Sequence, residues 1–95
     1  MIHAIVLIQC AIDEIPEAAQ TIAEIDGVSE VYSVTGEFDL VAIVRVHAHE
    51  DLARVIPSEM AKVEGVERTE TLIAFQVVSK HDLERLFSIG FDDAD

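Results

Sequence analysis

Positive charge is scarce in this sequence. Six Lys and Arg residues stand against 19 Asp and Glu, which gives a formal net charge of −13 and an isoelectric point near 4.4. Proteins that bind nucleic acid or anionic membranes use Lys and Arg to neutralise phosphate groups, so this composition argues against both partners. We interpret the acidity as a solvated surface rather than as an acidic recognition patch.

Cysteine occurs once, at Cys10, so no intrachain disulfide can form and the chain suits a reducing cytoplasm. Cys10 lies in an apolar run, which favours a buried, inert thiol over a reactive one. No apolar run approaches the roughly 20 residues that span a bilayer. The first three residues lead into strand-like sequence without the basic start of a signal peptide. We therefore expect a cytoplasmic protein.

Signatures of catalysis and of metal binding are also missing. The serines lie outside nucleophile-elbow motifs, and the four glycines form no phosphate-binding loop. His47 and His49 would lie on the same side of a strand that continued so far, but no third ligand follows at a typical spacing. A strand end that runs into a helix start explains this pair equally well. We expect no enzymatic activity, no cofactor and no metal.

Aliphatic residues, in contrast, are abundant. Hydrophobic residues make up 51% of the 95, and the mean hydropathy is +0.33. A domain of this size buries only about two-thirds of its extended surface. The surplus of apolar side chains therefore indicates a dense aliphatic core together with an apolar face that meets another subunit.

The apolar pattern predicts one α+β domain with elements in the order βαββαβ. The predicted strands cover residues 2–10, 28–35, 40–46 and 67–78. Two crossovers on four antiparallel strands place both helices on one face of the sheet. Both faces of the strands are apolar, whereas two helices cover only one. We expect the other face to pack against a second copy of the same sheet.

Two helices connect these strands. The first follows Asp13 as its N-cap and ends at Gly27, and the second follows the third strand and ends at Gly65. Pro57 lies inside the second helix, where its ring removes a hydrogen bond and clashes with the carbonyl four residues earlier. We therefore expect a kink or a break near residues 54–56.

The turn between the second and third strands is the most informative local feature; it reads Thr35-Gly36-Glu37-Phe38-Asp39. Gly36 can adopt a positive φ and expose backbone N–H groups, while Asp39 adds a negative charge. Together they would suit a zwitterion, with the amides on its carboxylate and Asp39 on its ammonium group. An ordinary hairpin turn, in which Asp39 bonds to its own backbone, is the simpler interpretation of the same residues.

Three segments resemble the effector-binding domain of the Lrp/AsnC (feast/famine) transcription regulators, also called the RAM domain. They are Gly27-Val28, Val34-Thr35-Gly36-Glu37-Phe38-Asp39-Leu40 and Gly65-Val66-Glu67-Arg68-Thr69-Glu70-Thr71. The resemblance covers about residues 2 to 79. It implies a ferredoxin-like βαββαβ fold, dimers formed sheet against sheet, and octamers in which four dimers form a ring.

The resemblance also implies that an amino acid or a related metabolite binds between subunits, near the turn after the second strand. The ligand-binding residues that it implies are Gly36, Phe38, Asp39, Thr69, Thr71, Thr35 and Glu37. The simpler interpretation of the two threonines is β-propensity alone. The boundaries that we expect are residues 1–79 for the RAM domain and 80–95 for a short C-terminal helix and an acidic tail.

Full-length regulators of this family carry an N-terminal helix-turn-helix domain. Residue 1 here opens directly on the first strand, so we expect a stand-alone module that does not bind DNA itself. It would then modulate transcription through partners, for example by mixed assembly with full-length relatives. Two alternatives stay open: a small dimeric α/β-barrel enzyme of the monooxygenase or isomerase type, and an assembly module that binds no ligand.

Overall fold

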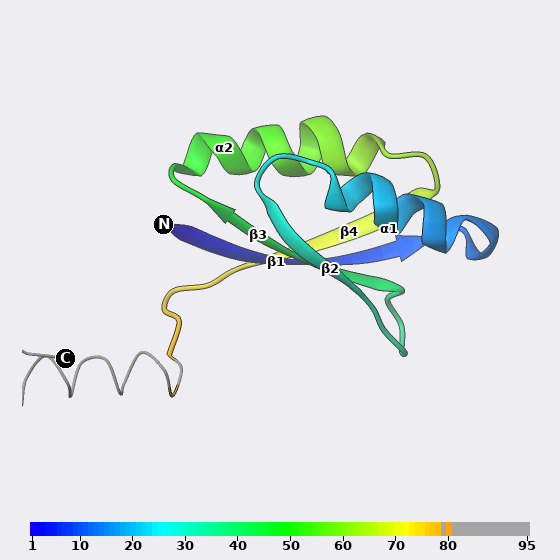
Figure 1. Cartoon of the computed structure of the whole chain (residues 1–95), viewed down its shortest axis with the longest axis horizontal. Helices are drawn as coiled ribbons and strands as arrows, with labels where there is room; N and C mark the ends of the chain where they lie inside the picture. Colours follow the sequence, from blue (N-terminus) through cyan, green and yellow to red (C-terminus); the bar gives the residue numbers. More distant parts are fainter. Residues whose placement is uncertain (79, 81–95) are drawn as a thin grey trace, which may run out of the picture.

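A four-stranded antiparallel sheet forms one layer of the molecule, and helices form the other (Figure 1). The computed structural model describes residues 1–78 and residue 80. Across the sheet the strands lie in the order β2-β3-β1-β4. The elements are β1 (Ile2–Cys10), η1 (Ile12–Glu14), α1 (Ile15–Ala23), β2 (Val28–Ser33), β3 (Leu40–Val46), α2 (His49–Ala53), η2 (Arg54–Glu59), η3 (Met60–Lys62) and β4 (Val66–Ile73). The predicted α+β, ferredoxin-like βαββαβ fold is confirmed.

The core lies between the sheet and the helices. Residues that pair across antiparallel strands point to the same face, and the pairs Val6–Ala42 and Ile8–Leu40 face the helices. All four side chains are fully buried. The strands also bury Ala4, Cys10, Val44 and Val46, and the helices contribute Ala18, Ile22, Leu52, Val55 and Met60. Alternate residues of β1 and β3 therefore point into the core, and the residues between them point to the other face of the sheet.

The first helix begins differently from the prediction. Residues Ile12–Glu14 form a turn of 3-10 helix, and α1 starts at Ile15 with Glu14 in the N-cap position and no side-chain cap hydrogen bond. The N-cap assignment of Asp13 is therefore wrong, because the chain leaves β1 through this tighter turn. Pro16 lies in the first turn of α1, where the missing N–H has no helical partner in any case.

The predicted role of Gly27 also needs correction. The first helix ends at Ala23, so Gly27 does not cap it. Gly27 has a φ of 104°, and a Cβ atom there would lie 3.0 Å from Cγ2 of Val55 and 3.2 Å from Cγ1 of Val46. The glycine is needed because the turn into β2 combines a left-handed conformation with close packing against the core.

Pro57 interrupts the second helix, as predicted. The regular helix α2 ends at Ala53, whose carbonyl would accept a hydrogen bond from position 57 if that residue had an N–H. The chain then widens into the π-helical η2 and narrows into the 3-10 turn η3. This irregular path still places Val55 and Met60 in the core. None of the described helices is long and apolar enough to cross a membrane.

The fourth strand ends earlier than predicted, at Ile73 instead of residue 78. Ile73 pairs with Ala4, and the N–H of Ala74 bonds to the carbonyl of His3 at 2.9 Å. Beyond this point β1 has almost no further residues to pair with. Residues 75–78 therefore leave the sheet, on the side away from the helices (Figure 1). The helix and acidic tail predicted for residues 80–95 fall almost entirely outside the described residues.

The second face of the sheet has no helix over it, and we call it the open face. Its centre is apolar, because the pairs Ile5–Ile43 and Leu7–Val41 point to this side. These four side chains are half-buried, and the exposed side chains of Tyr32 and Leu72 extend the same surface. The prediction that both faces of the sheet are apolar is confirmed.

Two carboxyl groups meet where η1 approaches the turn before β4. Gly65 has a φ of 96°, and a Cβ atom there would lie 2.9 Å from the Cβ of Glu14. Partial burial, a side-chain hydrogen bond with Glu64, and the charges of Glu64, Asp13 and Glu17 raise the pKa of Glu14 above its ordinary value. This contact therefore favours the protonated form of Glu14 in the folded protein.

We expect Ile22→Ala to lower the free energy of unfolding by about 2–5 kcal/mol, because it leaves a cavity in the core. Ile12→Ala is the matched control, since Ile12 is 88% exposed and Ile22 is fully buried. The control should change the free energy by no more than about 0.5 kcal/mol. Urea unfolding at one protein concentration measures both, and equal effects would contradict this assignment of the core.

Glu14→Gln should raise the melting temperature at pH 7 and have little effect near pH 4. The pKa of Glu14 is raised on folding, so the folded state binds its proton more tightly and this group favours folding as the pH falls. Removing its charge therefore helps most where it is ionised. Glu24→Gln also removes one negative charge, from an exposed position. If Glu24→Gln raises the melting temperature as much as Glu14→Gln does, the rise reflects only the lower net charge and not the surroundings of Glu14.

Candidate functional site

The turn between β2 and β3 is anchored to the central strand of the sheet. The N–H of Val34 bonds to the carbonyl of Asp39 at 3.0 Å, which closes the turn. The N–H of Asp39 bonds to the carbonyl of Ile8 in β1 at 2.8 Å. The predicted site residues of this turn therefore lie at one end of the sheet, against the C-terminal end of β1.

Asp39 makes a second bond to β1, through its side chain. The Oδ2 atom accepts the N–H of Cys10 at 2.8 Å, across 29 residues of sequence. The pairing of β1 with β4 shifts register between Gln9 and Cys10, so this N–H lies at an irregular point of the ladder. The side chain of Asp39 thus bonds to a distant strand rather than to its own turn, and its Oδ1 atom has no hydrogen-bond partner among the described residues.

Cys10 itself is buried, as predicted, with 7% of its surface exposed. Burial raises the pKa of its thiol above the ordinary value, and the negative charges of Asp39, Glu67 and Glu14 raise it further. Because the thiolate is the reactive form, these surroundings keep Cys10 a poor nucleophile.

Gly36 lies at the tip of the turn, where its φ is 115°. A Cβ atom at this position would meet nothing within 4 Å. Glycine is therefore favoured here by the left-handed backbone conformation, since a side chain would have room. Thr35 and Glu37 are exposed on either side. The backbone of the tip is thus open to a ligand or to a neighbouring chain.

Arg68 of β4 joins the turn on the open face. Its guanidinium carbon lies 4.9 Å from the centroid of the Phe38 ring, and its Nη2 atom lies 3.4 Å from Oε2 of Glu37. The side chain of Gln9 also reaches the turn, where its Nε2 donates to the carbonyl of Glu37 at 3.0 Å. The turn therefore gains a positive charge that stacks on an aromatic ring.

Sequence reasoning missed Arg68, although it directly precedes the predicted Thr69. The one feature of the sequence that could have indicated Arg68 is its position in the segment of residues 65–71, which resembles the Lrp/AsnC family. Its contact with the turn depends on the pairing of Arg68 with Gln9 across β1 and β4. That register joins segments far apart in the chain, and the apolar pattern does not fix it.

The two predicted threonines lie on the other face of the sheet. Thr69 pairs with Ile8 and Thr71 with Val6, so both point to the side that the helices cover. Thr69 is half-buried and pairs with Ile8, whose carbonyl accepts the N–H of Asp39, whereas Thr71 is exposed. The structure therefore brings residues 35–39 together with Arg68 and separates the threonine side chains from them.

The tip of the turn is exposed at Thr35, Gly36 and Glu37. Two surface cavities of the described chain, of about 460 and 380 Å³, lie elsewhere. The larger is lined by Asp26, Gly27, Val28, Ser29, Arg45, Val46, His47, Asp51 and Arg54. The smaller is lined by Glu14, Glu17, Thr21, Val63 and Glu64. None of the predicted ligand-binding residues lines either cavity.

The histidine pair does not form the arrangement that a continued strand would give. The strand β3 ends at Val46, His47 follows it, and His49 is the first residue of α2. Within the described residues, no group of three or more His, Cys, Asp and Glu side chains has the geometry to hold a metal ion. The strand-to-helix connection accounts for the pair.

Comparison with protein families identifies the domain. The model of the Lrp/AsnC ligand binding domain matches residues 3–83. The chain belongs to this family. The resemblance seen in the sequence is therefore confirmed.

Curated relatives of this Lrp/AsnC domain include regulators from Pyrococcus species. An uncharacterized HTH-type transcriptional regulator of Pyrococcus horikoshii, PH1916, is 38% identical over 64 residues, which are 67% of this chain and 43% of that protein. The Pyrococcus furiosus regulator PF1734, also uncharacterized and HTH-type, is 36% identical over 77 residues, 81% of this chain and 51% of that protein. The chain spans about half the length of these relatives.

Solved structures share the fold. TTHA0845 from Thermus thermophilus has a TM-score of 0.80 and 46% sequence identity, and the match covers 84% of this chain and all of that chain. AsnC of E. coli has a TM-score of 0.77 at 23% identity, over 82% of this chain and 53% of that chain. At that identity the second likeness shows the fold alone.

Asp39→Ala should lower the free energy of unfolding by about 1–3 kcal/mol, because the part-buried N–H of Cys10 loses its acceptor. Glu37→Ala is the control in the same turn. Its ion pair with Arg68 is exposed, so its loss should cost less than about 1 kcal/mol. Chemical unfolding of both variants measures the difference. If Asp39→Ala costs no more than Glu37→Ala, the bond to Cys10 contributes nothing to stability.

Proposed function

We propose that this Lrp/AsnC domain is a small-molecule sensor in an oligomer. It binds an amino acid or a related metabolite between subunits, at the turn of residues 35–39, and modulates transcription in the cytoplasm through partners. The observation that carries the proposal is the open backbone at Gly36, in a turn where the Oδ1 atom of Asp39 has no hydrogen-bond partner among the described residues.

The charges around the turn suit a zwitterion. An α-carboxylate needs N–H donors or a cation, which the Gly36 backbone and the guanidinium of Arg68 supply. An α-ammonium group needs an anionic acceptor, and Asp39 supplies one. Because Oδ2 of Asp39 is held by Cys10, the carboxylate is fixed in orientation before a ligand arrives. Phe38, half-buried beneath Arg68, offers an apolar contact.

A single subunit does not enclose a ligand at this turn. Small-molecule sites typically bury about 70–90% of the ligand surface, whereas Thr35, Gly36 and Glu37 are all exposed. A second chain over the turn would supply the missing walls. A Neisseria meningitidis transcriptional regulator, NMB0573, has the same fold at 14% identity with a TM-score of 0.73, and its structure is described as a complex with L-Met.

The apolar open face supports assembly into an oligomer. The apolar surface around Ile5, Leu7 and Ile43 supports a dimer in which two sheets pack face to face. Four such dimers in a ring would bring turns of neighbouring dimers together. Mixed assembly with longer relatives would link the domain to promoters, because its own net charge of −13 opposes direct contact with DNA.

The enzyme alternative is less well supported. A small α/β-barrel monooxygenase or isomerase would place a polar side chain such as His or Asn deep inside each subunit. Among the described residues, no polar or charged side chain is buried. The ligand-free assembly module stays as the second alternative, and a ligand screen separates it from the sensor.

We expect one or two of the twenty amino acids to raise the melting temperature by several degrees. A ligand at 100 times its Kd stabilises the folded state by about 2.7 kcal/mol. Differential scanning fluorimetry with each amino acid measures the shift. A flat panel on a stable oligomer would favour the ligand-free assembly module.

Variants of the turn test where the ligand binds. Asp39→Asn keeps the size of the side chain and removes its charge, so it should abolish the shift while the protein stays folded. Arg68→Ala should weaken the shift. Ile12→Ala is the control, since Ile12 lies in η1 and is exposed. An unchanged response in Asp39→Asn would contradict the proposed position of the ligand.

A further inference from the structure

The segment after β4 exposes apolar side chains to solvent. We call residues 75–78 the arm. Phe75 is 106% exposed, Val77 51% and Val78 64%. The last backbone hydrogen bond before the arm is that of Ala74 to His3. An isolated exposed apolar residue is common, but several in one short segment mark an interaction surface.

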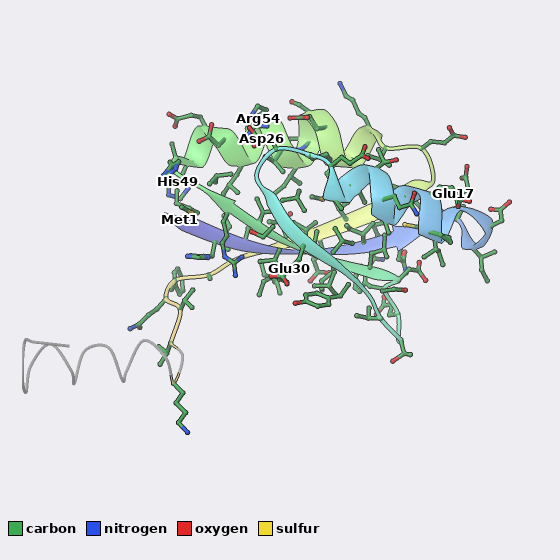
Figure 2. All side chains as sticks on the ribbon, viewed as in Figure 1. Met1, Glu17, Asp26, Glu30, His49 and Arg54 are labelled. Carbon is green, nitrogen blue, oxygen red and sulfur yellow. The ribbon has the colours of Figure 1, made fainter. Side chains whose placement is uncertain are left out.

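The arm is continuous with the open face. Leu72 pairs with Ile5 and therefore points to that face, where it is 47% exposed. The arm begins three residues later and lies on the same side of the sheet, away from α1 and α2 (Figure 1). Figure 2 shows side chains on both sides of the sheet, with Glu30 on the side opposite the helices.

We propose that the arm packs against a second copy of this chain, as a clasp at the side of the sheet-on-sheet dimer. The inference rests on that dimer, which belongs to the proposed function. Stacked sheets lie about 10 Å apart. A second sheet on the open face would occupy the side into which the arm projects, so the arm of each copy would lie beside its partner.

The area of the open face supports this role. A stable interface buries about 800 Å² on each partner. The central side chains, such as Leu7 and Val41, are already half-buried by their own strands, so they offer limited area. A fully exposed Phe adds about 150–250 Å². With two-fold symmetry, each copy gives one arm and receives one.

Charge favours a second copy over an acidic or a basic partner. At the edges of the open face most charges are paired, since Nη1 of Arg45 lies 3.7 Å from Oε1 of Glu30 and Arg68 pairs with Glu37, while Glu70, opposite Leu7, adds one acidic side chain. A basic partner would find more unpaired acid elsewhere on a chain of net charge −13. Two copies of the chain therefore meet with little repulsion at this apolar face, most of whose charges are compensated.

Phe75→Asp tests the clasp. We expect the dissociation constant of the dimer, measured by sedimentation velocity over a dilution series, to rise at least tenfold. The variant should fold normally, because Phe75 makes no buried contact in one subunit. Ile12→Asp is the matched control, since Ile12 is 88% exposed on η1, and its dissociation constant should equal that of the unchanged protein.

Ile43→Asp distinguishes the clasp from the dimer, because it places a charge at the centre of the open face. If Ile43→Asp dissociates the dimer and Phe75→Asp assembles like the unchanged protein, the clasp is wrong and the sheet-on-sheet dimer stands. If the unchanged protein is a monomer at all concentrations, the dimer and the clasp are both wrong.

A fluorescence measurement reports on the arm directly, since the chain contains no Trp. The Phe75→Trp variant should emit at shorter wavelength when assembled and shift to longer wavelength on dilution. The Ile12→Trp variant should emit at long wavelength throughout. Emission from Phe75→Trp that does not depend on concentration would overturn the proposal. Constant short-wavelength emission would mean that the side chain packs within its own subunit, and constant long-wavelength emission that it stays in solvent.

Discussion

The orientation of β1 is the constraint on which the rest of the structure depends. Its side chains alternate between the helix-covered core and the open face, so Ile8 and Leu7 serve opposite surfaces. A slip of one residue would exchange the two sets. Asp39 holds the strand in place at both Ile8 and Cys10, beyond the ladder itself. The same contacts fix the turn, so the core, the open face and the candidate site share one register.

Much of the fold follows from local spacing and was predictable. The apolar periods of the strands, the order of the elements and the two apolar sheet faces depend on residues close together in the chain. The break at Pro57 belongs to the same class, because its cause is one ring and one carbonyl four residues away. The errors at Asp13 and Gly27 arose where the chain takes a tighter turn or ends a helix early, and helix ends are the part of a helix that a sequence pattern fixes least.

The candidate site was predictable only in part, because its contacts span the chain. The turn of residues 35–39 was identified from its sequence. Its bond to Cys10 crosses 29 residues and its ion pair with Arg68 crosses 31, so both depend on strand register. The same reason explains why the threonines were placed with the turn, and why β4 was extended past Ile73. Neither the end of its partner strand nor the direction of a paired side chain can be read from one segment.

The double attachment of Asp39 has a thermodynamic consequence for recognition. A loop that orders only when a ligand arrives loses conformational entropy at that moment, and a ligand of few atoms makes too few contacts to offset much of this loss. Here the turn is ordered by the folding of the sheet, since its backbone and its carboxylate are both held by β1. The turn therefore belongs to the same cooperative unit as the core. The turn therefore loses its conformational entropy when the domain folds, and ligand binding does not have to offset this loss.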